Sequence, residues 1–431
     1  MFRHKSSGKT LRLVFVSVAA VVLVAVTAST VPARRSPFEP LSIFARALAF
    51  IELAYVEPVD QEKLVHGAIR GLADSLDPHS VFMDPEEYAI FNSDAEGRFA
   101  GIGVEVSTRD GWLTILSVFD GGPAAKGGLL PGDRFLAIEG EEARDLRLYD
   151  AVRRIRGEPG TTVNVTIRRE GRADALERTL TRAFIELDPV EIETLGKGAI
   201  YVRIKAFQEG TARELSLALD DVVMELKNRG GVEGVLIDVR DNGGGLLDEA
   251  VWVADEFLTT GTIVSTRGRD GEVIKQYSAR RAGTRPKWPM VVLINENTAS
   301  ASEIVAGALQ DQERATVVGV RSFGKGSVQT VYELPGGSAL KLTISRYYTP
   351  SGRSIQAEGI TPDLIAEQPR EDGAPGPIRE EELAGHLQAK HGGSRPMETR
   401  RAPEARGAPP TRFKDDPQGA QGYWVLREMM N

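Results

Sequence analysis

The residues of this sequence whose types could carry out a reaction are a serine and a lysine. Ser300 lies in the segment 298–303, and Lys325 lies between two glycines in the segment 323–329. A serine hydroxyl becomes a strong nucleophile when a neighbour removes its proton, and a lysine can remove it only while its own amine is neutral. A free lysine titrates near pH ~10.4, so burial must lower the pKa of Lys325 by several units. Together the two residues indicate nucleophilic catalysis at a desolvated site.

The sequence on either side of Lys325 indicates how it is held. Residues 317–320 are an apolar run typical of a buried strand, and residues 328–331 alternate in polarity like a second strand. We therefore expect Lys325 in a turn between two strands. Gln329 follows shortly after, and its amide oxygen could fix the direction of the lysine nitrogen without adding a charge.

Ser300 also has a purely structural interpretation. With Glu303 it fits a helix capping box, and Ile304 and Leu309 belong to the apolar face of a helix that follows. The two interpretations are compatible, because a helix N-terminus is electropositive and favours a developing oxyanion. Taken by itself, Lys325 is more typical of a solvated turn.

A rival class of site, the phosphate-binding loop, is indicated by residues 319–325, which match the start of its pattern G-x-x-x-x-G-K. The match fails at its end. Gly326 stands where a Ser or Thr should bind magnesium, and a strand pattern follows where a helix should begin. The sequence therefore argues against nucleotide binding here.

Several blocks of the sequence, all in the same order, closely resemble the C-terminal processing peptidases, also called tail-specific proteases of family S41. These are serine peptidases with a Ser-Lys-Gln site. The resemblance extends over residues 40–366. The matching blocks are residues 76–80, 101–104 and 238–245, the two segments that hold Ser300 and Lys325, and residues 346–352.

The resemblance implies a role for each matching residue of the site. Ser300 would be the nucleophile, Lys325 the general base and Gln329 the residue that orients the lysine. The backbone N–H of Ala301 would form one half of the oxyanion hole.

The other half of the oxyanion hole would come from the glycine turn after Asn242, and we assign it to Gly244. The commoner family form has Pro where this chain has Gly243, which makes the turn more flexible and leaves the choice among Gly243, Gly244 and Gly245 open. An ordinary tight turn after the apolar strand at 234–237 is the structural alternative.

Residues 97–184 resemble a PDZ domain. The glycine-rich loop Gly101-Ile102-Gly103-Val104 enters a strand, and a short helix is expected at Pro123. In a PDZ domain this loop offers backbone N–H groups to the terminal carboxylate of a peptide, whose tail adds a strand to the sheet. Arg156 matches a ligand-sensing position of regulated relatives and could pair with a carboxylate, although a plain surface arginine is the alternative.

The resemblance also implies the architecture. We expect an α/β protein whose peptidase core has the layered ββα arrangement of the ClpP/crotonase fold, with an inserted β-rich PDZ domain. The expected parts are a signal peptide or membrane anchor at 1–33, an N-terminal helical region at 38–96 that could mediate dimerisation, the PDZ domain at 97–184, the core at 185–366, and a Pro-, Gly- and charge-rich tail at 367–431. We expect the tail to be largely disordered and to end in a short amphipathic helix that could dock on a partner subunit.

Composition argues against several other classes. The 431-residue chain has a net charge of −8, which argues against nucleic-acid binding. It has no cysteine, so a thiol nucleophile and a disulfide framework are excluded. None of its five histidines has the spacing of a zinc motif, and we expect no metal and no other cofactor. His79, the histidine nearest a family motif, has the context of a turn or helix cap.

The first residues have the pattern of an export signal. Basic residues precede an apolar run from Leu13 to Ala28, and residues 31–33 offer a small-residue cleavage site. The run is long for a signal peptide and slightly short for a membrane-spanning helix, so cleavage and retention as an anchor both stay open. In either case we expect a periplasmic location.

Two hypotheses of function follow from the sequence. The first is a serine endopeptidase that recognises the C-terminal tails of exported proteins through its PDZ domain and cleaves upstream. The second is a resting or inactive form that acts as a PDZ adaptor or chaperone and needs a partner protein for activity. The joint presence of Ser300, Lys325 and Gln329 favours the peptidase.

Overall fold

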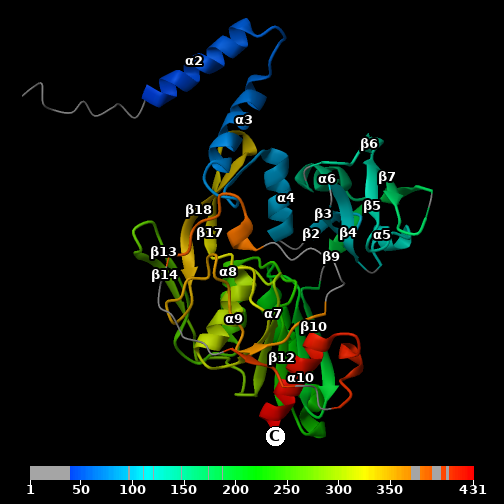
Figure 1. Ribbon diagram of the computed structural model, residues 1–431, viewed down its shortest axis with the longest axis vertical. Coiled ribbons are helices and arrows are strands. Elements are labelled where there is room, and N and C mark those ends of the chain that lie inside the picture. The colour runs from blue at the N-terminus through cyan, green and yellow to red at the C-terminus, as the bar shows by residue number, and fades with distance from the viewer. Residues whose placement is uncertain are drawn as a thin grey trace, which may run out of the picture. The chain divides into compact units, whose positions relative to one another are not determined.

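The computed structural model describes residues 39–95, 98–109, 111–119, 121–146, 148–172, 174–186, 188–369, 379–390, 399–403 and 407–431. These residues form two units that divide after Ala68. Figure 1 shows the course of the chain through both. The expected signal peptide or anchor at 1–33 lies outside the described residues, and no helix among the described residues is long and apolar enough to cross a membrane.

The core of the second unit is a seven-stranded sheet with the order β10-β11-β12-β15-β16-β19-β20. All neighbours after the antiparallel pair β10–β11 run parallel. Its central strands are continuous apolar runs, as a parallel sheet covered on both faces requires. The strands are β10 (Val190–Gly196), β11 (Ala199–Ile204), β12 (Gly234–Asp238), β15 (Met290–Ile294), β16 (Thr316–Gly319), β19 (Leu364–Ile365) and β20 (Arg400–Arg401).

Helices cover both faces of this sheet, and alternate residues of each strand face opposite layers. Helices α7 (Thr211–Leu226), α8 (Leu247–Asp255) and α9 (Ala301–Asp311) pack on one face, where Ile237 belongs to the main apolar cluster. Helix α10 (Pro417–Met430) packs on the other face, where Leu236 belongs to a second cluster (Figure 1).

A second sheet, in which all the described strand pairs are antiparallel, completes the core. Its order is β1-β18-β13-β14, and β17 pairs with β18. The strands are β1 (Val81–Met83), β13 (Thr262–Arg267), β14 (Val273–Ser278), β17 (Ser327–Glu333) and β18 (Ala339–Tyr348). Two sheets with helices packed on the larger one give the mixed α/β core that the sequence predicts.

The inserted domain is β-rich, as expected. Its six-stranded sheet encloses its own apolar core, and the expected helix at Pro123 is present as α5. A two-stranded pair, β2 (Arg98–Gly101) and β9 (Ala183–Glu186), closes the domain at its two ends in the chain. Its other elements are β3 (Val104–Arg109), β4 (Trp112–Val118), α5 (Pro123–Lys126), β5 (Arg134–Ile138), β6 (Glu141–Glu142), α6 (Leu148–Ile155), β7 (Thr162–Arg168) and β8 (Leu176–Thr181).

The N-terminal region contains the expected helices, α2 (Glu39–Ala54), α3 (Gln61–Asp74) and α4 (Pro85–Ala95). It is not purely helical, since β1 pairs with β18 of the peptidase core. The prediction missed this strand because three residues are too short to show alternation.

The expectation of a largely disordered tail is wrong for its described residues. Residue Glu380 opens a short 3₁₀ turn (Glu380–Glu382) and is fully buried, and β20 joins the central sheet. The terminal helix α10 exists, but it packs on the sheet of its own chain. Composition misled the prediction, because the tail buries polar residues such as Glu380 and Gln418 as well as its few apolar ones.

Candidate active site

Ser300 lies at the start of α9, in the loop that follows β15. Its backbone is strained, with φ 55° and ψ −115°, a conformation that non-glycine residues rarely adopt. Its N–H donates to Glu303 Oε2 at 2.7 Å, and the N–H of Ala299 donates to the Asn242 carbonyl at 3.0 Å. Ser300 is therefore the capping residue at the N-terminus of α9. The capping interpretation is confirmed, and the nucleophile interpretation stays a prediction.

Glu303 joins the serine loop to the lysine loop. Its side chain is fully buried and accepts four hydrogen bonds. Oε2 accepts from Ser300 N at 2.7 Å and Lys325 N at 2.9 Å, while Oε1 accepts from Gly324 N at 2.8 Å and Ser322 Oγ at 2.5 Å. Burial raises the pKa of Glu303 to about 7, and these donors oppose the rise. The sequence indicated only the capping part of this arrangement.

Lys325 lies in the turn between β16 and β17, as predicted, and is largely desolvated. Burial lowers the pKa of its amine, while the nearby carboxylates of Glu380, Glu303 and Asp77 act in the opposite direction. Within the described residues Nζ makes no hydrogen bond, and none joins it to Ser300 Oγ. The structure thus brings the backbone N–H groups of the serine and the lysine onto one carboxylate, without a direct hydrogen bond between the two side chains.

Gln329 lies on β17 with its amide already engaged. Nε2 donates to Ser327 Oγ at 3.0 Å and to Thr343 Oγ1 at 3.2 Å. His79 lies in a turn, as expected, where its N–H donates to Asp77 Oδ1 at 2.9 Å. Its ring also bonds through Nε2 to Glu380 Oε2 at 2.8 Å. A contact between two residues so far apart in the sequence cannot be predicted from the local pattern around either of them.

The glycine turn lies directly against Ser300. A Cβ added to Gly244 would come within 2.8 Å of Ser300 Cβ and 2.9 Å of Ala301 N. However, the N–H of Gly244 donates to Asn242 Oδ1 at 2.9 Å. Gly244 can therefore serve the oxyanion only when that bond is released, and the choice among the three glycines stays a prediction.

Alanine substitutions in this turn should show whether activity depends on the close approach of Gly244 to Ser300 or only on the flexibility of the glycine turn. Gly244 has φ +103° and no room for a Cβ, whereas a Cβ on Gly243 meets nothing within 4 Å. We expect Gly244→Ala to lower kcat/KM about 100-fold, because displacing a nucleophile by about 1 Å costs that much. Gly243→Ala is the matched control and should stay within about threefold. Equal activity of the two variants, measured with one peptide substrate, would contradict the placement.

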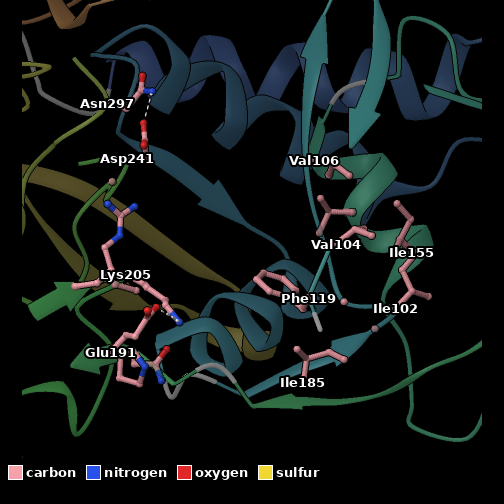
Figure 2. Close-up of a pocket in the computed structure, with 18 of the residues that line it drawn as sticks. Ile102, Val104, Val106, Phe119, Ile155, Ile185, Glu191, Lys205, Asp241 and Asn297 are labelled. Atoms are coloured by element: carbon pink, nitrogen blue, oxygen red, sulfur yellow. Dashed lines mark hydrogen bonds and ion pairs between the residues drawn. The ribbon is translucent and has the colours of Figure 1, made fainter. Parts of the chain in front are cut away.

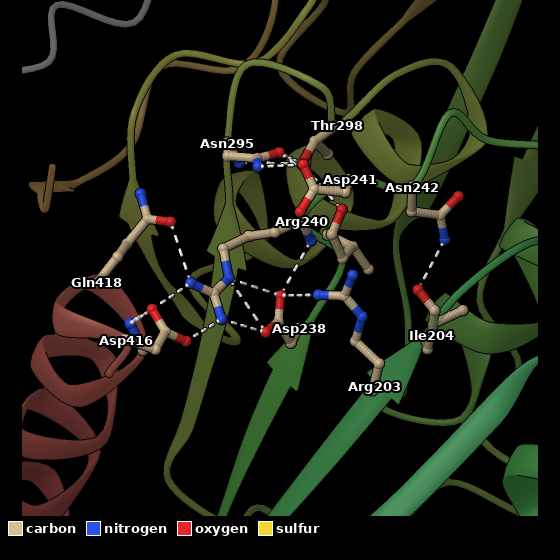
Figure 3. Close-up of polar contacts among 12 residues, drawn as sticks. Arg203, Ile204, Asp238, Arg240, Asp241, Asn242, Asn295, Thr298, Asp416 and Gln418 are labelled. Carbon is tan, nitrogen blue, oxygen red and sulfur yellow. Dashed lines mark hydrogen bonds and ion pairs between the residues drawn. The ribbon is translucent and has the colours of Figure 1, made fainter. Parts of the chain in front are cut away.

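A buried ion-pair network lies at the end of β12, just before the glycine turn in the chain (Figure 3). Asp238, at the end of β12, accepts from Arg240 Nη2 at 2.6 Å and from Arg203 Nη1 at 3.0 Å. Burial alone would raise the pKa of Asp238, but its bonds and charge pairing with these arginines hold it below its ordinary value.

The same network reaches the C-terminal helix. The Asp416 carboxylate accepts hydrogen bonds from Arg240 Nη1 at 2.9 Å and Nη2 at 2.7 Å. Asp416 is also the N-cap of α10, where its Oδ1 accepts the N–H of Gly419. Burial by itself would lower the pKa of Arg240. The carboxylates of Asp416 and Asp238 outweigh burial and raise the pKa above its ordinary value. The sequence block 238–245 marked this region, but nothing in it indicated Asp416.

The glycine-rich loop of the inserted domain borders a pocket that is apolar on the side of this domain and lined by charged side chains, among them Lys205 and Asp241, on the side of the core. Figure 2 shows Ile102, Val104, Ile155 and Ile185 lining this pocket. The loop is held by the N–H of Ala124, which donates to the Ile102 carbonyl at 2.7 Å. The apolar side of this pocket fits an apolar C-terminal residue of a peptide.

Arg156 follows α6 and lies beside the same loop. Its Cγ is 3.6 Å from the position of a Cβ on Gly101. The sequence-predicted loop and sensor residues are therefore neighbours, while their function stays a prediction. Within the described ranges no group of three acidic or histidine side chains could hold a metal ion.

Comparison with known proteins gives consistent matches along the chain. The model for peptidase family S41 matches residues 198–366, that for a PDZ domain residues 100–180, and that for the N-terminal domain of activating protease CtpB residues 23–87. A carboxy-terminal-processing protease of Bartonella bacilliformis is 38% identical over 417 residues, which cover 96% of this chain and 94% of the relative.

Further relatives agree. The carboxy-terminal processing protease CtpB of Bacillus subtilis is 37% identical over 329 residues, covering 75% of this chain and 67% of the relative. The solved structure of a photosystem II D1 C-terminal processing protease is 31% identical, with a TM-score of 0.53, and covers 77% of this chain and 88% of that one.

Proposed function

Because this chain belongs to peptidase family S41, and so is a serine peptidase, we propose that Ser300 is its nucleophile, Lys325 its general base and Gln329 the residue that orients the lysine. The observation that carries the proposal is the convergence of the two loops on Glu303. The N–H groups of Ser300 and Lys325 share one carboxylate oxygen, beside a strained serine backbone and a desolvated lysine.

In the proposed reaction the neutral amine of Lys325 takes the Ser300 proton while Oγ attacks the substrate carbonyl carbon. The oxyanion accepts hydrogen bonds from the N–H of Ala301 and from the glycine turn, at the electropositive start of α9. Lys325 then gives the proton to the leaving amine as the C–N bond breaks. Water hydrolyses the acyl-enzyme with Lys325 again as base.

We propose that substrates are exported proteins with apolar C-terminal tails, bound through the PDZ loop from Gly101 to Val104. The apolar side of the pocket at this loop supports that choice, and Arg156 would respond to the bound carboxylate. The protein would act in the periplasm, with its N-terminal segment either cleaved or retained as an anchor. The exposed apolar side chains of α2, among them Ile43 and Phe50, support homodimerisation, and an adaptor or activator protein is a further partner.

The test is degradation of an unstructured protein with an apolar tail by the chain from residue 34, beside the same substrate ending in an amide. We expect amidation to lower kcat/KM about tenfold, because the amide removes the charge that the PDZ loop binds. Ser300→Ala serves as the blank. Equal rates for the free and amidated tails would contradict tail recognition.

A resting form remains the second candidate, since no hydrogen bond joins Ser300 Oγ to Lys325 Nζ within the described residues. Tail binding without cleavage by the purified chain would favour it. Cleavage that appears on adding periplasmic extract, and that Ser300→Ala abolishes, would identify a form awaiting an activator. If no cleavage appears even with the extract, the result would favour a non-enzymatic adaptor.

A further inference from the structure

The sequence block 76–80 has no part in the catalytic roles above, yet its acidic residue lies at the site. Asp77 follows α3 and is 6% exposed. Its Oδ1 accepts from His79 N at 2.9 Å, Ser80 N at 3.0 Å and Thr343 Oγ1 at 3.0 Å, and its Oδ2 accepts from Ser80 Oγ at 2.7 Å. Burial would raise the pKa of Asp77, but these bonds keep it below its ordinary value. Asp77 is therefore ionised and can only accept.

This restriction sets the direction of every hydrogen bond in the cluster. The one hydroxyl hydrogen of Thr343 is donated to Asp77, so its oxygen can only accept from other groups. Ser80 likewise gives its hydrogen to Asp77, and its oxygen accepts the N–H of Thr343 at 3.1 Å. The side chain that approaches Thr343 Oγ1 from β17 must therefore be a donor.

That side chain is Gln329. Its Nε2 meets Thr343 Oγ1 at 3.2 Å and Ser327 Oγ at 3.0 Å, which uses both amide hydrogens. Because Thr343 cannot donate to it, the amide cannot turn over without losing this bond. Its oxygen is thereby left for a donor elsewhere. Lys325 lies in the turn just before β17, the strand that carries Gln329, and the charge of Asp77 is among those that raise the pKa of its amine.

We propose that Asp77 and Thr343 are positioning residues that fix the amide of Gln329 with its oxygen toward Lys325. The inference rests on the proposed role of Gln329. It gives the block 76–80 a function in catalysis. The carboxylate of Asp77 sets the direction of the hydrogen bonds that run through Thr343 to Gln329, whose amide oxygen is directed at the general base.

Thr343→Val is the direct test, because it keeps the β-branched shape on β18 and removes only the hydroxyl. An amide free to turn no longer directs the lone pair of the neutral amine at Ser300, so we expect kcat to fall about tenfold with KM unchanged. An amide oxygen also favours the ammonium, so its loss should move the acidic limb of the kcat profile to lower pH. Thr343→Ser should restore both values.

Two further variants make the test specific. Thr330→Val is the matched control on the neighbouring strand and should behave like the wild type. In a Gln329→Ala background Thr343→Val should cause no further loss, because the hydroxyl acts through the amide. An additive loss, or a fall in kcat without the pH shift, would overturn the inference.

Failure of the inference can be told from failure of the proposed function. If Lys325→Ala is inactive while Thr343→Val matches the wild type, the positioning chain is wrong and the site stands. If Gln329→Ala itself is fully active, the proposed role of Gln329 fails as well. Should Thr343→Val fold poorly, judged by thermal unfolding, Thr343→Ala made in the wild type and in the Gln329→Ala background decides: a loss of kcat of the same size in both backgrounds would overturn the inference.

Discussion

Ser300→Ala and Lys325→Ala should each lower kcat/KM by about 10⁴-fold or more, which corresponds to about 5.5 kcal/mol of lost transition-state stabilisation. Neither residue can act without the other, because the serine needs a base and the neutral lysine needs a proton to take. The double variant should therefore be no less active than either single one. Single-turnover cleavage of one tailed peptide measures all three.

Two neighbouring residues supply the controls. Ser302 is fully buried and donates its hydroxyl to the Asn242 carbonyl at 3.0 Å, so Ser302→Ala should keep most of the activity. Lys341 is a second desolvated lysine, whose pKa burial also lowers. Lys341→Ala should retain activity within about tenfold. Turnover by Ser300→Ala at the wild-type rate would reject Ser300 as the nucleophile. Loss of activity in Ser302→Ala alone would assign that role to Ser302.

The pH dependence follows from the direction of the Lys325 shift. Activity requires the neutral amine, so the rate rises with pH through the pKa of Lys325, and burial places that limb below the ordinary value of ~10.4. The same shift costs stability: the folded state binds this proton less tightly than the unfolded chain does, so stability is lost as pH falls below the unfolded pKa. Lys325→Met should thus be inactive and yet more stable at neutral pH.

Sequence patterns could predict the parts of the site that are local. The strand before Lys325, the turn around it and the helix after Ser300 each have their own periodicity or cap. The resemblance supplied the order of the domains and the roles that we propose for these residues. What both could not supply were contacts between distant segments, such as His79 with Glu380 and Arg240 with Asp416.

These distant contacts share a physical cause. A charged residue is predicted at the surface unless its partner is known, because burying a charge without a partner is costly. Glu380 and Asp416 both lie in a region whose composition indicates disorder. Each is held because a side chain from a distant segment meets it, the imidazole of His79 in one case and the guanidinium of Arg240 in the other. Only the folded chain shows that the tail completes the site from outside the expected core boundary at 366.

Glu303→Gln should be the most damaging substitution outside the catalytic pair, although it changes one atom. The carboxylate of Glu303 faces only donors on its Oε2 side, Ser300 N and Lys325 N. On its Oε1 side it faces Gly324 N and Ser322 Oγ, and that serine oxygen already accepts the N–H of Ile360 at 2.6 Å. A glutamine must place its NH₂ group against one of these two pairs.

Either orientation leaves buried N–H groups unsatisfied, at about 1–3 kcal/mol each. With NH₂ toward the Oε2 side, Ser300 and Lys325 lose their common acceptor and both loops shift. With NH₂ toward the other side, Gly324 is displaced and Lys325 moves with it. Because a displacement of about 1 Å in a reacting group costs about 10²-fold, and both groups depend on Glu303, we expect kcat to fall about 10³-fold.

The measurement pairs kcat with thermal unfolding and with tail binding by the PDZ domain. Glu303→Gln should lower the unfolding free energy by about 2–4 kcal/mol while tail binding is unchanged. Glu313→Gln, at an exposed position just after the same helix, is the matched control and should alter neither quantity. A Glu303→Gln enzyme that keeps wild-type kcat would show that the shared carboxylate does not position the serine and the lysine, and the site would then need another explanation for how its two loops are held together.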